Sequence, residues 1–151
     1  MSDIKKILVI IDPQVDFMDL EDSALPVIGA TADMDRVANL IDKVGDMYDE
    51  IHVTLDSHHN YHIAHPLFFI GKDGKAPDPG TVISIEDINT GTWKAKVPAH
   101  QGLLTDYVQQ LKDNNRYDLT VWPPHCLIGS IGATIYQPLF DALSRWEIRN
   151  C

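Results

Sequence analysis

The sequence lacks the features that define several broad protein classes. Its two cysteines, Cys126 and Cys151, are too few for a disulfide framework. It has no signal peptide and no long apolar span, so a reducing cytoplasm is the expected location. Internal repeats and low-complexity segments are absent too. A length of 151 residues is typical of one domain, and we expect residues 1–151 to form a single domain.

Positive charge is scarce as well. The chain has 12 lysines and arginines against 22 aspartates and glutamates, which gives a net charge of −10. Nucleic acids and anionic membrane surfaces attract clustered lysine and arginine, so this balance argues against both partners. A small neutral or cationic ligand fits the composition better.

One short stretch is rich in metal-binding side chains. Residues 54–66 read TLDSHHNYHIAHP and follow an alternating apolar segment, 51–55, that is typical of a strand. Side chains two positions apart on an extended chain point the same way, so Asp56 and His58 can face one point. Carboxylate and imidazole suit zinc, iron or manganese. His125, whose backbone is restricted by two preceding prolines, is the candidate third ligand.

The other histidines of this stretch leave alternatives open. His62 follows His58 at a spacing of four residues and can join the same site. His59 and His65 fit better as capping, solvated or pocket-lining side chains. For the whole stretch, the ordinary alternative to a metal site is that the histidines are solvated or hydrogen-bonded to the backbone. The presence of His125 favours the metal site over this alternative.

The rest of the chain predicts an α/β fold with a parallel sheet. Residues 7–11 are a continuous β-branched run, typical of a strand buried on both faces. Asp12 follows it, where catalytic carboxylates lie in open α/β sheets, although a strand-ending aspartate before a proline turn is equally consistent. An apolar stripe predicts a helix over 31–47, capped by Asp33 or Thr31. Together these segments form a β-α-β unit.

The second half of the sequence is less regular. We expect residues 66–98 to be an inserted flap in which 82–85 and 92–97 pair as short strands. Such a flap is a natural lid over a site. Further helices are predicted around 103–111 and after Pro138, with a short strand at 119–122.

Three motifs, taken in order, resemble those of a known family. They are DPQVDF at 12–17, Asp56-x-His58, and WPPHC-x-x-G-x-x-GA at 122–133. Together they resemble the nicotinamidase branch of the isochorismatase-like cysteine hydrolases. The resemblance implies a Rossmann-like parallel sheet with helices on both faces, six strands in a complete member. It also implies hydrolysis of nicotinamide, or another small aromatic amide, to the acid and ammonia.

The resemblance also implies roles for individual residues. Asp12 is the implied catalytic aspartate. The implied ligands of a divalent metal, most simply zinc with iron or manganese as alternatives, are Asp56, His58 and His125. Phe17 and Trp122 are implied to wall the pocket for the pyridine ring.

The chain departs from the family pattern in its triad. The family places a lysine and then a nucleophilic cysteine after the metal histidine, whereas Lys94 and Lys96 precede it and neither Cys126 nor Cys151 matches the cysteine position. We therefore expect a fold that is incomplete in its C-terminal half. We also expect a homo-oligomer or a complementing C-terminal fragment, and no activity from this chain alone.

Two other functions remain open from the sequence. One is a non-catalytic metal- or ligand-binding remnant of a cysteine hydrolase. The other is a hydrolase in which the metal activates water and Asp12 acts as base, a route that needs no cysteine.

Overall fold

The computed structural model describes residues 4–150, which divide into two compact units. Unit 1 comprises residues 4–57 and 125–150, and unit 2 comprises residues 58–124. Each unit has its own hydrophobic core. The single domain with a flap at 66–98 stays a prediction of the sequence.

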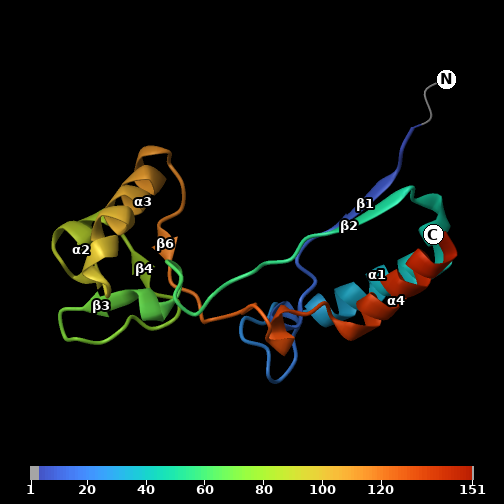
Figure 1. Cartoon of the computed structure of the whole chain (residues 1–151), viewed down its shortest axis with the longest axis horizontal. Coiled ribbons are helices and arrows are strands. Elements are labelled where there is room, and N and C mark those ends of the chain that lie inside the picture. Colours follow the sequence, from blue (N-terminus) through green and yellow to red (C-terminus); the bar gives the residue numbers. More distant parts are fainter. Residues whose placement is uncertain (1–3, 151) are drawn as a thin grey trace. The chain divides into compact units, whose positions relative to one another are not determined.

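Unit 1 is built on a parallel pair of strands, as the sequence predicts. Strand β1, Ile7–Ile10, pairs with β2, Glu50–Val53, with Ile10 opposite Val53 (Figure 1). The backbone pairing continues past the strands, since the Thr54 amide donates to the Ile10 carbonyl at 3.0 Å. The segments that follow β1 and β2 therefore leave the same edge of the sheet.

Two helices cover one face of this pair. Helix α1, Ala30–Val44, lies beside α4, Gln137–Asn150 (Figure 1). The Arg145 guanidinium donates to both carboxylate oxygens of Asp42, at 3.0 and 2.7 Å, which joins the helices on the solvent side. Between helices and strands lies an apolar cluster that includes Leu8, Ile10, Ala38, Ile41, Ile51, Val53, Leu139 and Ala142.

The expected burial of residues 7–11 on both sheet faces is wrong. Leu8 and Ile10 pack against the helices, but Ile7 is 48% exposed and Val9 55% exposed. Side chains alternate between the faces of a strand, so an apolar run does not reveal whether one face or both are covered. The predicted helical stripe packs in this core through Met34, Val37 and Ile41, but Leu40 is exposed and Ala38 is buried instead.

The N-terminus of α1 is capped by a residue that the sequence analysis did not identify. Neither Thr31 nor Asp33 caps the helix with its side chain; instead the Asp19 carboxylate accepts from the Gly29 and Thr31 amides, at 3.0 and 2.9 Å. Hydrogen bonds from Thr31 and then Gly29 hold the pKa of Asp19 well below its usual range. Because the cap comes from a loop ten or more residues upstream, local helix signals could not reveal it.

Replacing this cap should destabilise unit 1 in a pH-dependent way. We expect Asp19→Ala to lower the thermal unfolding midpoint by a few degrees at pH 7. A depressed folded-state pKa stabilises the fold above the unfolded pKa, near 3.8, so the difference from wild type should shrink as the pH falls below about 4. Circular dichroism melts at pH 7 and pH 3 measure both effects. Exposed Asp22→Ala is the matched control, and equal shifts for the two variants would contradict the cap.

Unit 2 is a small mixed structure with a separate core. Strand β3, Phe69–Gly71, pairs antiparallel with β5, Trp93–Ala95, and β4, Val82–Ile83, pairs antiparallel with β6, Leu119–Thr120. Helices α2, Ile85–Asn89, and α3, Gln101–Asp113, complete the unit (Figure 1). The core includes Phe68, Phe69, Ile83, Ile85, Ile88, Leu104, Val108, Leu119 and Val121.

The expected pairing of 82–85 with 92–97 is wrong. Strand β4 ends at Ile83, and the next residue, Ser84, is the N-cap of α2. The Ser84 hydroxyl accepts from the Asp87 amide at 3.2 Å, and the Asp87 carboxylate accepts from the Ser84 amide at 2.9 Å. This capping box starts a helix at Ile85, and it is readable in the sequence as Ser-x-x-Asp. Among the helices of residues 4–150, none has the length and apolar character needed to cross a bilayer.

Candidate metal centre and active site

The candidate active site of unit 1 begins where β1 ends. Asp12 is half-buried and has a positive φ of 48°, which aspartate tolerates better than most residues but which costs about 1–3 kcal/mol. Its amide donates to the Thr54 carbonyl at 3.2 Å, and its carboxylate accepts from the Thr54 hydroxyl at 2.6 Å. Segments from β1 and β2 therefore fix this carboxylate together at the sheet edge.

Asp56 and His125 meet at the same edge of unit 1. The His125 Nε2 atom lies 3.2 Å from Asp56 Oδ2, although the residues are far apart in sequence. His125 is buried, and the Phe17 ring contacts it edge-on with centroids 5.5 Å apart. Two ligand atoms of a tetrahedral zinc with bonds of 2.0–2.1 Å are roughly 3.3 Å apart. The spacing of this pair therefore fits a shared divalent cation.

A fully buried glutamine holds Asp56 in position. The Gln14 side-chain amide donates to the Asp56 carbonyl at 2.8 Å and to the Ala133 carbonyl at 3.0 Å. Its oxygen accepts from the Asp56 amide at 2.6 Å. Gln14 thus ties the turn after β1 to the turn after β2 and to the segment before α4. Its role is to fix the backbone from which the Asp56 carboxylate projects.

A buried aspartate does the same for the chain around His125. Asp16 Oδ2 accepts from the Cys126 amide at 2.6 Å, and Asp16 Oδ1 accepts from the Ala24 amide at 3.2 Å. Cys126 has a positive φ of 46°, a strained conformation for a residue with a side chain. A Cβ added to Gly132 would lie 2.1 Å from Asp16 Oδ2, so only glycine fits beside this carboxylate.

Cys126 is poorly suited to act as a nucleophile. Burial, together with the negative charges of Asp16, Asp56 and Asp12, raises the pKa of the Cys126 thiol to about 12. The thiolate is the nucleophilic form, and at neutral pH this thiol is protonated. This agrees with the motif alignment, in which Cys126 does not occupy the nucleophile position. Cys151 lies outside the described residues.

A cavity of unit 1 adjoins Asp12 and Phe17. Its volume is about 560 Å³, within the range of small-molecule sites. Asp12 and Phe17 line it together with Met18, Val27, Ile28 and Met34. Trp122, the other predicted wall of the pocket, is an exposed residue of unit 2.

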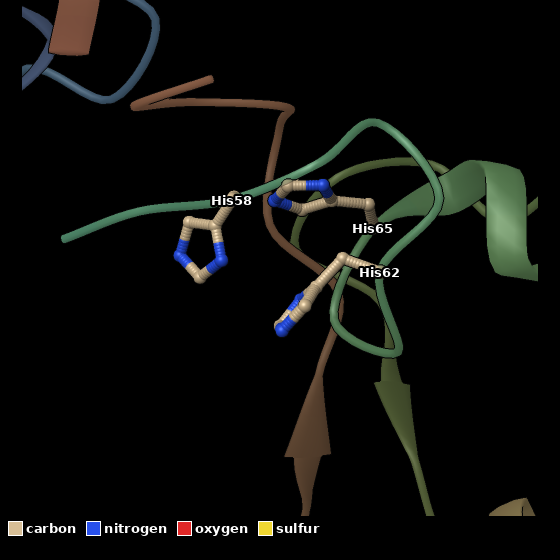
Figure 2. Close-up of side chains that lie close together, drawn as sticks. All are labelled: His58, His62 and His65. Atoms are coloured by element: carbon tan, nitrogen blue, oxygen red, sulfur yellow. The ribbon is translucent and has the colours of Figure 1, made fainter. Parts of the chain in front are cut away.

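The remaining candidate residue, His58, is the first residue of unit 2 and follows Asp56 by two positions. Its ring lies against those of His62 and His65 within the same unit (Figure 2). His65, expected to cap, to face solvent or to line the pocket mouth, is fully buried, and its side chain makes no capping hydrogen bond.

Gln14 and Asp16 are the functional residues that sequence reasoning missed. Both stand inside the DPQVDF motif, so the signal was present. Amphipathic patterns assign polar residues in a turn to solvent, and neither side chain could be assigned to partners more than 40 residues away.

Comparison with known proteins identifies the fold. No family model matches the sequence, and no curated protein matches it significantly. The yeast nicotinamidase Pnc1p, solved also with the inhibitor nicotinaldehyde, aligns with a TM-score of 0.60 and 18% identity over 94% of this chain and 53% of its own. A nicotinamidase/pyrazinamidase from Acinetobacter baumannii aligns with a TM-score of 0.55 and 18% identity over 92% of this chain and 48% of its own.

These alignments establish a shared fold. The chain has the α/β fold of the nicotinamidases, as its motifs predict, and it spans about half the length of the structures it matches.

Proposed function

We propose that this chain carries the metal- and acid-bearing part of an amidase of the nicotinamidase type, which hydrolyses nicotinamide to nicotinate and ammonia. The observation that carries the proposal is the pair Asp56 and His125, 3.2 Å apart at the sheet edge that also bears Asp12. The nicotinamidase fold supports the same substrate class. In open α/β sheets this edge is where ligands bind.

The metal site of this proposal consists of Asp56, His58 and His125. Asp56 and His125 already have the spacing of two ligands, and His58 is two residues from Asp56 along the chain. One carboxylate and two imidazoles suit zinc, with iron and manganese as alternatives. A bound divalent ion would supply positive charge that holds the ring nitrogen of the substrate and so orients the amide.

The chain's own residues have separate tasks in this proposal. Asp12 accepts the proton of the attacking nucleophile and delivers it to the leaving ammonia. Phe17, beside Asp12 in the cavity and edge-on to His125, contacts one side of a flat aromatic ring. Trp122 is the proposed second wall of the ring pocket. Orientation of the substrate by such walls can lower the barrier by several kcal/mol.

The attacking thiolate must come from another cysteine, because Cys126 is buried and its pKa is raised to about 12. A segment that carries the family's lysine and cysteine is the proposed source. We therefore expect ammonia release from nicotinamide only when such a segment is added. Turnover by the isolated chain that survives both Cys126→Ala and Cys151→Ala would contradict this mechanism and favour metal-activated water.

The role of Asp12 is testable in the complemented enzyme. Proton transfer by a positioned side chain contributes about 10²–10⁴ in rate, so Asp12→Asn should lower ammonia release at least about a hundredfold. Asp33→Asn is the matched control, because Asp33 lines the same cavity but is exposed and paired with Arg36. Equal rates for the two variants would exclude Asp12 from the chemistry.

A non-catalytic metal-binding remnant is the second candidate. The protonated, buried state of Cys126 favours it, because no reactive thiol is then found among the described residues. It predicts metal bound by the chain and no ammonia release under any complementation.

A further inference from the structure

Unit 2 contains a cluster of three imidazoles, of which the proposed amidase uses only His58. His58, His62 and His65 come from one short loop, and Figure 2 shows their rings gathered together. The ring centroids lie 4.4 Å apart for His58 and His62, and 5.1 Å apart for the other two pairs. One ring nitrogen from each residue lies within 4.8 Å of the corresponding nitrogens of the other two.

Two hydrogen bonds of this loop define the tautomers of His65 and His62. His65 Nδ1 lies 3.1 Å from the His59 carbonyl, which can only accept, so Nδ1 carries the proton and the lone pair of the neutral ring is on Nε2. The Ala64 amide donates to His62 Nδ1 at 3.2 Å, so this bond occupies the lone pair of His62 and must be given up before His62 can bind an ion. A carbonyl that orients the far nitrogen is the usual support of a metal-binding histidine.

We propose that His58, His62 and His65 form a second divalent-cation site, for an ion of the zinc class, separate from the pair Asp56 and His125. The proposal goes beyond the amidase. An all-imidazole set of three ligands suits zinc, copper, nickel or cobalt and leaves a coordination position for water. Ions that prefer oxygen, such as magnesium and calcium, are disfavoured.

The loop is held in a way that suits binding. The His65 amide donates to the His62 carbonyl at 2.9 Å and the Phe68 amide to the His65 carbonyl at 3.1 Å, so the backbone turns tightly between two of the ligands. Tyr61 and Ile63 pack against the core of unit 2, which anchors the loop. Tetrahedral coordination needs ligand nitrogens roughly 3.3 Å apart, so binding requires a small contraction of the cluster. Ligands this close in sequence cost little loop entropy.

His58 belongs to both proposed ligand sets. A neutral imidazole offers one lone pair, so His58 serves one ion at a time. Removing the Asp56 carboxylate should therefore weaken the first set and leave the imidazole cluster intact.

The test uses the full chain, stripped of metal with a chelator and titrated with Co²⁺ or Zn²⁺. The variant Asp56→Asn should still bind one equivalent, with Co²⁺ giving the visible spectrum of a nitrogen-rich tetrahedral site. In that background His62→Ala should weaken the affinity by more than about a hundredfold, since loss of a supporting residue alone costs 10–100-fold. His59→Ala, an exposed histidine of the same loop, should leave the affinity unchanged.

Two results would overturn the second site. They are an Asp56→Asn variant that binds no metal, or equal affinities for the His62→Ala and His59→Ala variants in that background. Far-UV circular dichroism establishes that each variant is folded, and His62 is partly exposed, so its replacement should be tolerated. Failure of the amidase proposal is read separately in the His62→Ala background, where only the first ligand set remains, as a metal affinity that His125→Ala leaves unchanged.

Discussion

Replacing Gln14 by leucine is expected to destabilise unit 1 by about 3 kcal/mol or more. Leucine has a similar volume but cannot hydrogen bond, so the Asp56 amide, the Asp56 carbonyl and the Ala133 carbonyl would each lose a buried partner. Each unsatisfied group costs about 1–3 kcal/mol, and relaxation or entering water recovers part of the sum. Urea unfolding followed by circular dichroism measures the loss.

Gln109→Leu is the matched control for this change. Gln109 is exposed on α3 and donates only to the Asp113 carboxylate at 2.7 Å, so its replacement should stay within about 0.5 kcal/mol of wild type. The Gln14 variant should also bind metal more weakly, because the Asp56 backbone is no longer fixed. If both leucine variants have the same stability, Gln14 does not tie the turns together.

Replacing Gly132 by alanine should have an effect of similar size. The added Cβ would lie 2.1–2.3 Å from all three atoms of the Asp16 carboxylate group, which must then move. Asp16 would lose its 2.6 Å bond from the Cys126 amide, and the strained turn beside His125 would lose its support. Overpacking of this kind costs about 1–3 kcal/mol, and the broken buried bond adds to it.

Gly102→Ala is the control for this variant. A Cβ at Gly102, in the first turn of α3, meets no atom within 4 Å. Alanine is the better helix former, so this change should be neutral or stabilise by up to about 1 kcal/mol. Unfolding midpoints in urea compare the two, and a Gly132 variant as stable as the Gly102 variant would show that Asp16 has room to move without cost.

The sequence predicted the parts of unit 1 that follow from periodicity. Residues 7–11 and 51–55 carry strand patterns and 31–47 a helical one, and the structure has β1, β2 and α1 there. The order of these elements also placed Asp12 and Asp56 at one sheet edge, because parallel strands end on the same side. The proximity of His125 to Asp56 was predicted from the metal-binding types of their side chains and not from periodicity.

What the sequence did not predict depends on long-range partners. The outer face of β1 is exposed at Val9, which no pattern within the strand can reveal. Asp19 caps a helix from a distant loop, and Gln14 and Asp16 bind backbone groups more than 40 and 100 residues away. The wrong strand pairing predicted for 82–85 has a different cause. The capping box at Ser84 is a local sequence signal for a helix, but the β-branched residues around it were given more weight and favoured a strand.

The central claim is that Asp56 and His125 together bind a divalent metal. Anomalous scattering at the zinc absorption edge, from crystals of the zinc-loaded full chain, tests it most directly. We expect an anomalous peak at bonding distance from both Asp56 Oδ2 and His125 Nε2. Ordered zinc found only elsewhere, with these two atoms still in direct contact, would contradict it.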